Sequence, residues 1–307
     1  MSDISVGSAL GEGFGLIRRR PLSVLAWGGV QLLLTLASWG LYGPVYISFL
    51  GRMTATGGQP PAQDPAFMAQ MMQMQGLGLL VGIAGLVVSI VIYCAVFRAV
   101  LHPEQNRFAY MRIGAAELFL GVLAIAGYIA FIVALMVVMI PTAIVVGVLA
   151  GTHNTAAAVI VGIAVAVAAF VAVIYVGLRF SLVGPMMVQD NAFRLMESWT
   201  LTRGRVGSLF AIAVCLILLI MAVEIVLVIV LFAVGAATLG GMAGGFTNTA
   251  ALFAQGPGPV LAKLAPLLMV LAVLWAPVMG AFMAIMGAPW ARAYRDLNQS
   301  DLKETFA

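Results

Sequence analysis

The sequence predicts an all-α polytopic membrane protein with six transmembrane helices and cytoplasmic amphipathic interfacial helices. Of its 307 residues, 63% are hydrophobic and only 8% are charged, whereas a soluble domain carries roughly 25% charged residues. Its apolar residues form long continuous runs, and crossing the hydrocarbon core as a helix takes about 20 such residues. Its arginines are concentrated in every second gap between these runs. A transmembrane β-barrel is excluded, because barrel strands are alternating segments of roughly 10 residues.

Six apolar segments are each long enough to be a spanning helix. They lie near residues 22–50, 76–101, 117–140, 156–180, 210–235 and 264–288. Asp3, Glu12 and three consecutive arginines precede the first segment, so we expect an uncleaved first span and not a signal peptide. Small residues recur at every fourth position in several segments, as at Ala276 and Gly280, which predicts close approach between helices.

The distribution of basic residues predicts the orientation. Thirteen of the fifteen Lys and Arg residues fall in gaps on one side, and only Arg52 and Lys263 fall on the other. Short loops rich in Lys and Arg stay cytoplasmic. We therefore expect both termini in the cytoplasm and the chain in the bacterial inner membrane. The basic excess fits attraction to anionic phospholipids of the inner leaflet better than nucleic-acid binding.

A short, more polar stretch with a similar core precedes each outgoing span. These stretches begin at Phe14, Phe108 and Phe193. In the third, apolar residues recur at i, i+3, i+4 and i+7 from Ala192 to Trp199, which is typical of an amphipathic helix at the membrane interface.

Two interpretations of this likeness stay open. The chain is either one six-helix domain made of three units, or one whose junctions look alike because every interface needs the same residue types. In the first case each unit is a cytoplasmic surface helix followed by an out-and-in hairpin. Those units would span about 1–101, 102–190 and 191–307.

The incoming spans end in arginines beside aromatic residues. Trp at the level of the headgroups and Arg reaching the phosphates anchor helix ends in a membrane. We therefore predict a set of interfacial residues that contact lipid. They are Arg18, Arg19, Arg20, Arg98, Arg112, Arg179, Trp199, Arg203, Trp290, Arg292 and Arg295.

One stretch carries a family resemblance. Residues 179–190 read Arg-Phe-Ser-Leu-Val-Gly-Pro-Met-Met-Val-Gln-Asp, and residues 197–204 read Glu-Ser-Trp-Thr-Leu-Thr-Arg-Gly. This resembles the signature of a bacterial superfamily of six-span membrane proteins, which includes the membrane domain attached to some glycerophosphodiester phosphodiesterases. The resemblance implies the span count but not the phosphodiesterase activity, because the catalytic domain with its acidic and His metal cluster has no counterpart in this sequence.

The same residues also have a direct physical interpretation. Gly184-Pro185 is expected to end or kink the fourth span, because proline lacks an N–H and clashes with the preceding turn. Asp190 or Asn191 can cap the next helix through a side-chain oxygen. Gly204 is expected to stop that helix.

Glu224 is the only formally charged residue deep within a predicted span. A central carboxylate costs about 2.5–3.5 kcal/mol to insert, so it is expected to face the bundle or to be protonated. It is therefore the intramembrane functional candidate, as a proton- or cation-coupled site. The structural alternative is a protonated Glu224 that holds neighbouring helices together by a hydrogen bond.

The sequence offers no metal site, cofactor site or catalytic residues. Four methionines at residues 68–74 follow Asp64-Pro65, which is typical of a helix start. Thioethers can bind Cu(I), but without nearby Cys or His we expect an interfacial helix there. The chain is thus predicted to be a non-enzymatic inner-membrane protein that organises helices and lipid, or binds a protein partner or a second copy. The alternative is a small transporter or lipid-handling carrier that uses Glu224.

Overall fold

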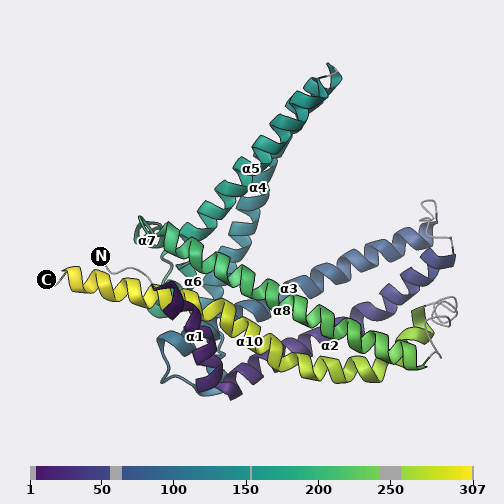
Figure 1. The fold of residues 1–307 in the computed structure, drawn as a ribbon, viewed down its shortest axis with the longest axis horizontal. Coiled ribbons are helices and arrows are strands. Elements are labelled where there is room, and N and C mark those ends of the chain that lie inside the picture. Colours follow the sequence, from purple (N-terminus) through teal and green to yellow (C-terminus); the bar gives the residue numbers. More distant parts are fainter. Residues whose placement is uncertain (1–4, 56–63, 153, 243–256, 306–307) are drawn as a thin grey trace. The chain divides into compact units, whose positions relative to one another are not determined.

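The computed structural model describes residues 5–55, 64–152, 154–242 and 257–305, and every regular element in these ranges is helical (Figure 1). The elements are α1 (Val6–Arg19), α2 (Pro21–Ala55), α3 (Pro65–Leu101), the single turn η1 (Arg107–Tyr110), α4 (Ala115–Gly151), α5 (Thr155–Phe180), α6 (Val183–Asp190), α7 (Leu195–Leu201), α8 (Val206–Met242) and α10 (Pro257–Thr305).

Within the described residues, six helical segments are long and apolar enough to cross a membrane, which confirms the all-helical class and the number of candidate spans. They are Pro21–Met53, Pro65–Leu101, Arg107–Gly151, Thr155–Asp190, Val206–Val234 and Leu268–Asn298. These segments indicate a multi-pass membrane protein. Their helical form follows from the solvent, because a chain in hydrocarbon must satisfy every backbone polar group internally.

The described residues form two compact units. One comprises Met1–Gly13, Tyr93–Ala213 and Met286–Ala307, and the other comprises Phe14–Ile92 and Val214–Ile285. These limits differ from the predicted unit boundaries near residues 101 and 190, because long helices such as α3 and α10 contribute to both compact units. The threefold repeat stays a prediction.

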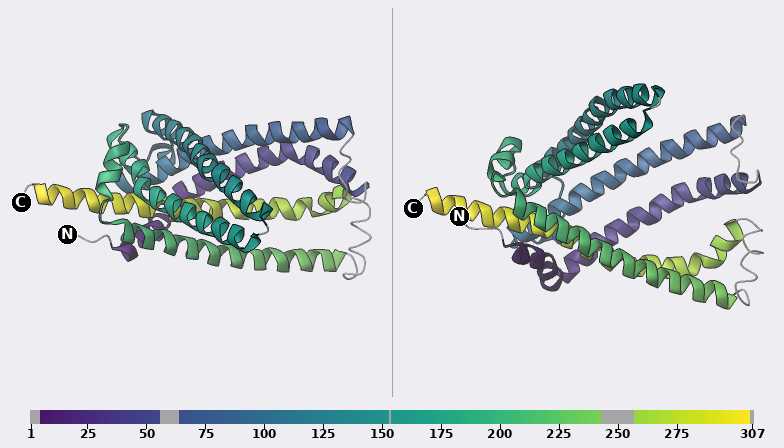
Figure 2. Two further views of the ribbon diagram at one scale, coloured as in Figure 1. Left: turned by 90° about the horizontal axis from the view of Figure 1, so that it is seen from above. Right: turned by 45° about the horizontal axis from the view of Figure 1, so that its top comes forward.

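In the first unit, α4 and α5 pack side by side as a hairpin (Figures 1 and 2). None of the most apolar stretch of α4 is buried. Val137, for example, is 67% exposed, and Ile144 is 61% exposed. A surface this apolar is suited to lipid, because water would penalise it in proportion to its area.

In the second unit, α2 and α10 approach through two glycines. A methyl group on Gly28 would lie 1.8 Å from the carbonyl oxygen of Ala276, and one on Gly280 would lie 2.0 Å from that of Val24. No side chain fits at either position, so the predicted close approach at Gly280 is confirmed.

The region around α6 differs in detail from the prediction. α5 ends at Phe180, before Gly184-Pro185, and Pro185 falls in the first turn of α6, where its missing N–H costs nothing. Capping of the following helix by Asp190 or Asn191 is wrong: Asn191 is the left-handed C-cap of α6, with φ 54°, and Arg194 is the N-cap of α7. Gly204, with φ +77°, lies between α7 and α8, as its predicted role as a helix stop requires.

The second predicted surface helix is only one turn. In and beside η1, Phe108, Ala109 and Tyr110 have φ of 48°, 53° and 65°, a left-handed conformation that costs roughly 1–2 kcal/mol per residue. Local contacts hold this turn, because the hydroxyl of Tyr110 donates to the carbonyl of Pro103 at 3.0 Å. The carbonyl of Tyr110 accepts from Arg98, at 3.2 Å.

Candidate functional site

Arg98, at the end of α3, is buried and 1% exposed. Its Nη2 forms an ion pair with Glu117, which is 5% exposed, and its Nη1 donates to the carbonyl of Tyr110. The second carboxylate oxygen of Glu117 accepts from the N–H of Gly114 at 3.0 Å. This pair therefore joins the end of α3 to η1 and to the first turn of α4.

Arg179, at the end of α5, is 6% exposed and has no carboxylate partner among the described residues. Its guanidinium carbon lies 4.3 Å from the centroid of the Trp199 ring, and its Nη1 donates to the hydroxyl of Thr202 at 3.4 Å. The hydroxyl of Ser198 donates to the carbonyl of Arg179 at 3.0 Å. A guanidinium over an aromatic face is stabilised by the ring quadrupole, so Arg179 fixes α7 to the end of α5.

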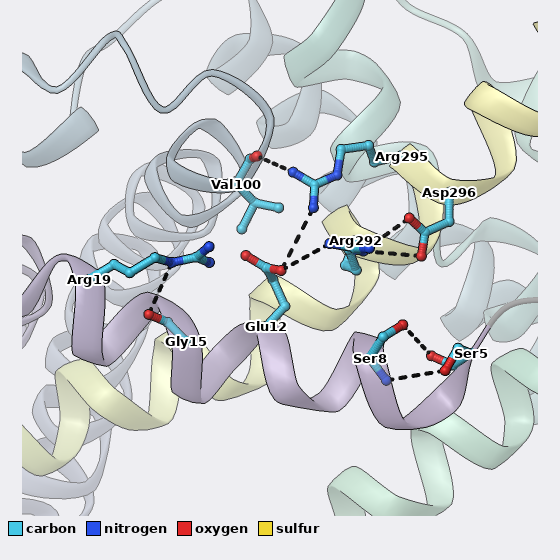
Figure 3. Close-up of polar contacts among 9 residues, drawn as sticks. All are labelled: Ser5, Ser8, Glu12, Gly15, Arg19, Val100, Arg292, Arg295 and Asp296. Atoms are coloured by element: carbon cyan, nitrogen blue, oxygen red, sulfur yellow. Dashed lines mark hydrogen bonds and ion pairs between the residues drawn. The ribbon is translucent and has the colours of Figure 1, made fainter.

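Arg292 and Arg295, near the end of α10, both contact Glu12 of α1 (Figure 3). Their nitrogens lie 3.4 Å and 3.7 Å from Glu12 Oε2. Arg292 also pairs with Asp296 at 3.0 Å, and Arg295 donates to the carbonyl of Val100 at 3.2 Å. These contacts link the first helix of the chain to its last helix.

The three clusters follow one scheme. An arginine at the end of an incoming helix binds the segment that precedes an outgoing helix: η1 and the start of α4 for Arg98, α7 for Arg179, and α1 for Arg292 and Arg295. Arg98 and Arg179 were predicted to contact headgroups, but the structure buries both against protein groups. An arginine beside an aromatic residue suits either role, and the tertiary contacts decide between them.

The other predicted lipid contacts are more accessible. Arg18, Arg19, Arg112 and Arg203 are exposed. Arg20, Trp199, Trp290, Arg292 and Arg295 are half-buried. Among the residues that the structure describes, Arg18, Arg112 and Arg203 form no ion pair.

A polar cavity of about 540 Å³ lies between α6, α7, the turn before α8 and the end of α10. Its walls include Asp190, Arg194, Glu197, Arg203, Arg205 and Tyr294. Sequence reasoning identified only Arg203 of this set as a site residue, because the lining comes from four separate segments. The spacing Asp-x3-Arg-x2-Glu and the run Thr-Arg-Gly-Arg were the local signals available.

The charges in this cavity are only partly matched. Arg194 Nη1 lies 2.8 Å from Glu197 Oε2 and 3.5 Å from Asp190 Oδ2. The hydrogen bond to Glu197, with smaller contributions from the charges of Asp190 and Glu197, raises the pKa of Arg194 above its usual value, so this arginine stays charged. Arg203 and Arg205 have no carboxylate partner in the described ranges. The cavity thus carries three cations and two anions.

Glu224 lies exposed on α8, in a shallow recess of about 310 Å³ that is lined only by residues of its own helix. Its neighbours there are Met221, Ile225, Val228 and Ile229. It makes no hydrogen bond or ion pair with another described residue. The structure therefore does not bring it together with the groups that a proton- or cation-coupled site needs.

The comparisons with known proteins return no match: no family model, curated protein or solved structure matches this chain. The resemblance of residues 179–204 to the six-span superfamily accordingly stays a prediction.

Proposed function

We propose that this chain is a non-enzymatic, multi-pass protein of the bacterial inner membrane that binds phospholipid headgroups at an arginine-rich cytoplasmic face. By holding headgroups there, it organises lipid around its own helices or around a protein partner. The proposal builds on the six apolar helices and on the sequence asymmetry of Lys and Arg.

The observation that carries this proposal is the pairing of free arginines with exposed apolar side chains. Arg112 is exposed, and the adjacent Ile113 is 88% exposed. Phe108, on the same loop, is 87% exposed, and Met196 of α7 is 73% exposed. Water penalises such apolar groups, whereas the headgroup–acyl boundary accepts both them and the cations. Each arginine near an anionic leaflet adds about 1 kcal/mol of attraction.

The buried carboxylates support a structural role better than a catalytic one. Glu12 and Glu117 are both nearly fully buried and both form ion pairs with arginines. A general acid or base must reach a substrate proton at hydrogen-bonding distance. These two carboxylates instead join helix ends.

Orientation is tested by cysteine labelling in a variant in which Cys94 and Cys215 are replaced by alanine. Arg18→Cys and Arg52→Cys then place single thiols at exposed positions predicted to face opposite sides. We expect a membrane-impermeant maleimide to label Arg52→Cys in spheroplasts and Arg18→Cys only in inverted vesicles. The reverse pattern would refute the orientation.

Lipid binding is tested with the full chain purified in mild detergent. We expect mass spectrometry to detect retained phospholipid after repeated detergent exchange, and removal of that lipid to lower the unfolding temperature. A chain that retains no phospholipid, and whose stability does not respond to added phospholipid, would contradict the proposed function.

The alternative, a small transporter or lipid-handling carrier built on Glu224, has less support. Inserting a mid-helix carboxylate into lipid costs free energy, so the side chain of such a residue is expected to be covered by other helices. Yet the recess beside Glu224 belongs to α8 alone. The headgroup-binding proposal does not need this residue.

A further inference from the structure

We propose that the 540 Å³ cavity between α6, α7 and α10 is a headgroup site for a phosphodiester that carries a primary amine, as in phosphatidylethanolamine. This inference rests on the proposed function and specifies its ligand. The volume falls within the roughly 300–1,000 Å³ of small-molecule sites.

The ends of three candidate spans meet at the cavity, which is what a headgroup site requires. The candidate span Thr155–Asp190 ends at Asp190, Leu268–Asn298 ends at Asn298, and Val206–Val234 begins directly after Arg205. All three of these residues line the cavity. The site therefore gathers the ends of three apolar helices, which sit at the boundary between acyl chains and water.

Arg203 and Arg205 supply the phosphate end of the site. Both line the cavity and neither is paired with a carboxylate in the described ranges. Gly204 between them adopts φ +77°, a conformation that other residues adopt only with strain. This turn at Gly204 lies between two arginines whose guanidinium groups both line the same cavity. A guanidinium binds phosphate oxygens through two parallel N–H donors, which suits a phosphodiester.

Asp190 supplies the amine end. Glu197 is engaged with Arg194 by a 2.8 Å hydrogen bond, whereas Asp190 is held only by a 3.5 Å ion pair to the same arginine. Because Glu197 engages Arg194, the carboxylate of Asp190 is left with room for a further donor. An ammonium group offers three donors for the oxygens of Asp190, while the phosphate balances the net positive charge of the whole cavity lining.

Tyr294 adds a hydrogen-bond donor at the wall of the cavity. It is 4% exposed, lines the cavity, and its hydroxyl has no hydrogen-bond partner among the described residues. Its oxygen is not among the buried side-chain atoms that lack a partner, so it is open to the space of the cavity. A phosphate oxygen in the cavity would accept from this hydroxyl and satisfy it.

Exposed apolar side chains favour a lipid over a soluble phosphate. Phe193 and Met196, which are next to the lining residues Arg194 and Glu197 in the sequence, are 52% and 73% exposed, and Phe210 at the start of α8 is 46% exposed. These side chains can receive the acyl chains of a lipid whose headgroup occupies the cavity.

The test is native mass spectrometry of the full chain in detergent, titrated with dioleoyl phosphatidylethanolamine or dioleoyl phosphatidylglycerol. We expect preferential binding of the amine-bearing lipid. The double variant Arg203→Gln/Arg205→Gln should bind it roughly tenfold more weakly, because charge-assisted hydrogen bonds are lost. The matched control Arg52→Gln/Arg107→Gln removes the same charge at exposed positions outside the cavity and outside the predicted lipid contacts, and should keep the wild-type preference.

A second pair of variants separates the two ends of the site. Asp190→Asn should keep phosphate binding but lose the preference for the amine-bearing lipid. Arg203→Lys/Arg205→Lys retains the charge but lacks the two parallel N–H donors of each guanidinium group. This variant should bind the amine-bearing lipid weakly while folding normally. If this lysine variant binds as tightly as the wild type, the assigned geometry is wrong.

Several outcomes overturn the inference. The first is equal weakening by the cavity variant and the matched control, which indicates surface attraction alone. The second is a preference for phosphatidylglycerol in the wild type. The third is displacement of the lipid by inorganic phosphate or soluble glycerophosphoethanolamine at equal concentration, which assigns the cavity to a free phosphate. Lipid retention that is unaffected by the cavity variants refutes this site and leaves the proposed function standing, whereas no retention by the wild type refutes both.

Discussion

Replacing Glu117 by glutamine should destabilise the protein strongly, because it removes the anion beside a buried arginine. Arg98 is 1% exposed, and its remaining anchored contact is the 3.2 Å hydrogen bond to the carbonyl of Tyr110. Removing one partner of a buried ion pair costs about 3–5 kcal/mol. The charged Arg98 can still donate to the neutral amide oxygen, and such a charge-assisted hydrogen bond recovers about 1.5–3 kcal/mol, so we expect a net loss of about 1–3 kcal/mol.

The assay is unfolding by sodium dodecyl sulfate in mixed micelles, followed by the fluorescence of the five tryptophans. Glu104→Gln is the matched control, because the Glu104 side chain is 65% exposed and, among the described residues, forms an ion pair with His102 alone. An exposed pair contributes about 0–1 kcal/mol. The control should therefore unfold almost as the wild type does.

A double-mutant cycle tests the reasoning further. Arg98→Met/Glu117→Gln removes the orphaned charge, while the amide oxygen introduced by Glu117→Gln can still accept from the N–H of Gly114. We expect this double variant to be more stable than Glu117→Gln alone, because an apolar side chain can replace a buried ion at little cost. If the double variant is less stable than the single one, or if the loss at Glu117 matches that at Glu104, the buried pair does not stabilise the fold as argued.

Three further predictions concern other parts of the chain. Gly280→Ala should cost about 1–3 kcal/mol by overpacking the α2–α10 contact, whereas Gly29→Ala, with open space around it, should be neutral or slightly stabilising; equal effects in the same unfolding assay would contradict the packing. Trp199→Leu should cost about 2 kcal/mol through loss of the ring over Arg179, and Trp199→Phe less, so equal losses would exclude the cation–π contribution. Glu224→Gln should change the free energy of unfolding by no more than about 0.5 kcal/mol relative to the wild type. In proteoliposomes, loss of a pH-driven flux in this variant would establish the transporter alternative, whereas an unchanged flux would exclude a transport role for Glu224.

The elements of the fold that depend on local chemistry were predictable. A spanning helix is recognised within one continuous segment, because its length and apolarity are set by the bilayer and not by distant residues. The same holds for Gly204, whose freedom to adopt positive φ is a property of the residue itself. The N-cap of α7 was not predictable in this way. It depends on where α6 ends and α7 begins, and the local sequence allows either Asn191 or Arg194 to be the residue that starts α7.

Contacts between distant segments were beyond local reasoning. Glu12 and Arg292 are 280 positions apart, and no spacing rule relates them. Likewise, an arginine beside an aromatic residue fits a lipid phosphate and a protein carboxylate equally well, so the sequence could not separate the buried Arg98 and Arg179 from the exposed Arg112 and Arg203.

The sequence by itself therefore determined the helical class, the six long apolar helices and the places where charged residues cluster, because each depends on composition over a short stretch. Only the tertiary structure decided which arginines contact protein groups and join helix ends, and which line the cavity beside Tyr294 without a carboxylate partner among the described residues. The physical reason is that the free energy of a charged side chain depends on the partner and the burial that folding gives it, and neither is a property of the segment in which it lies.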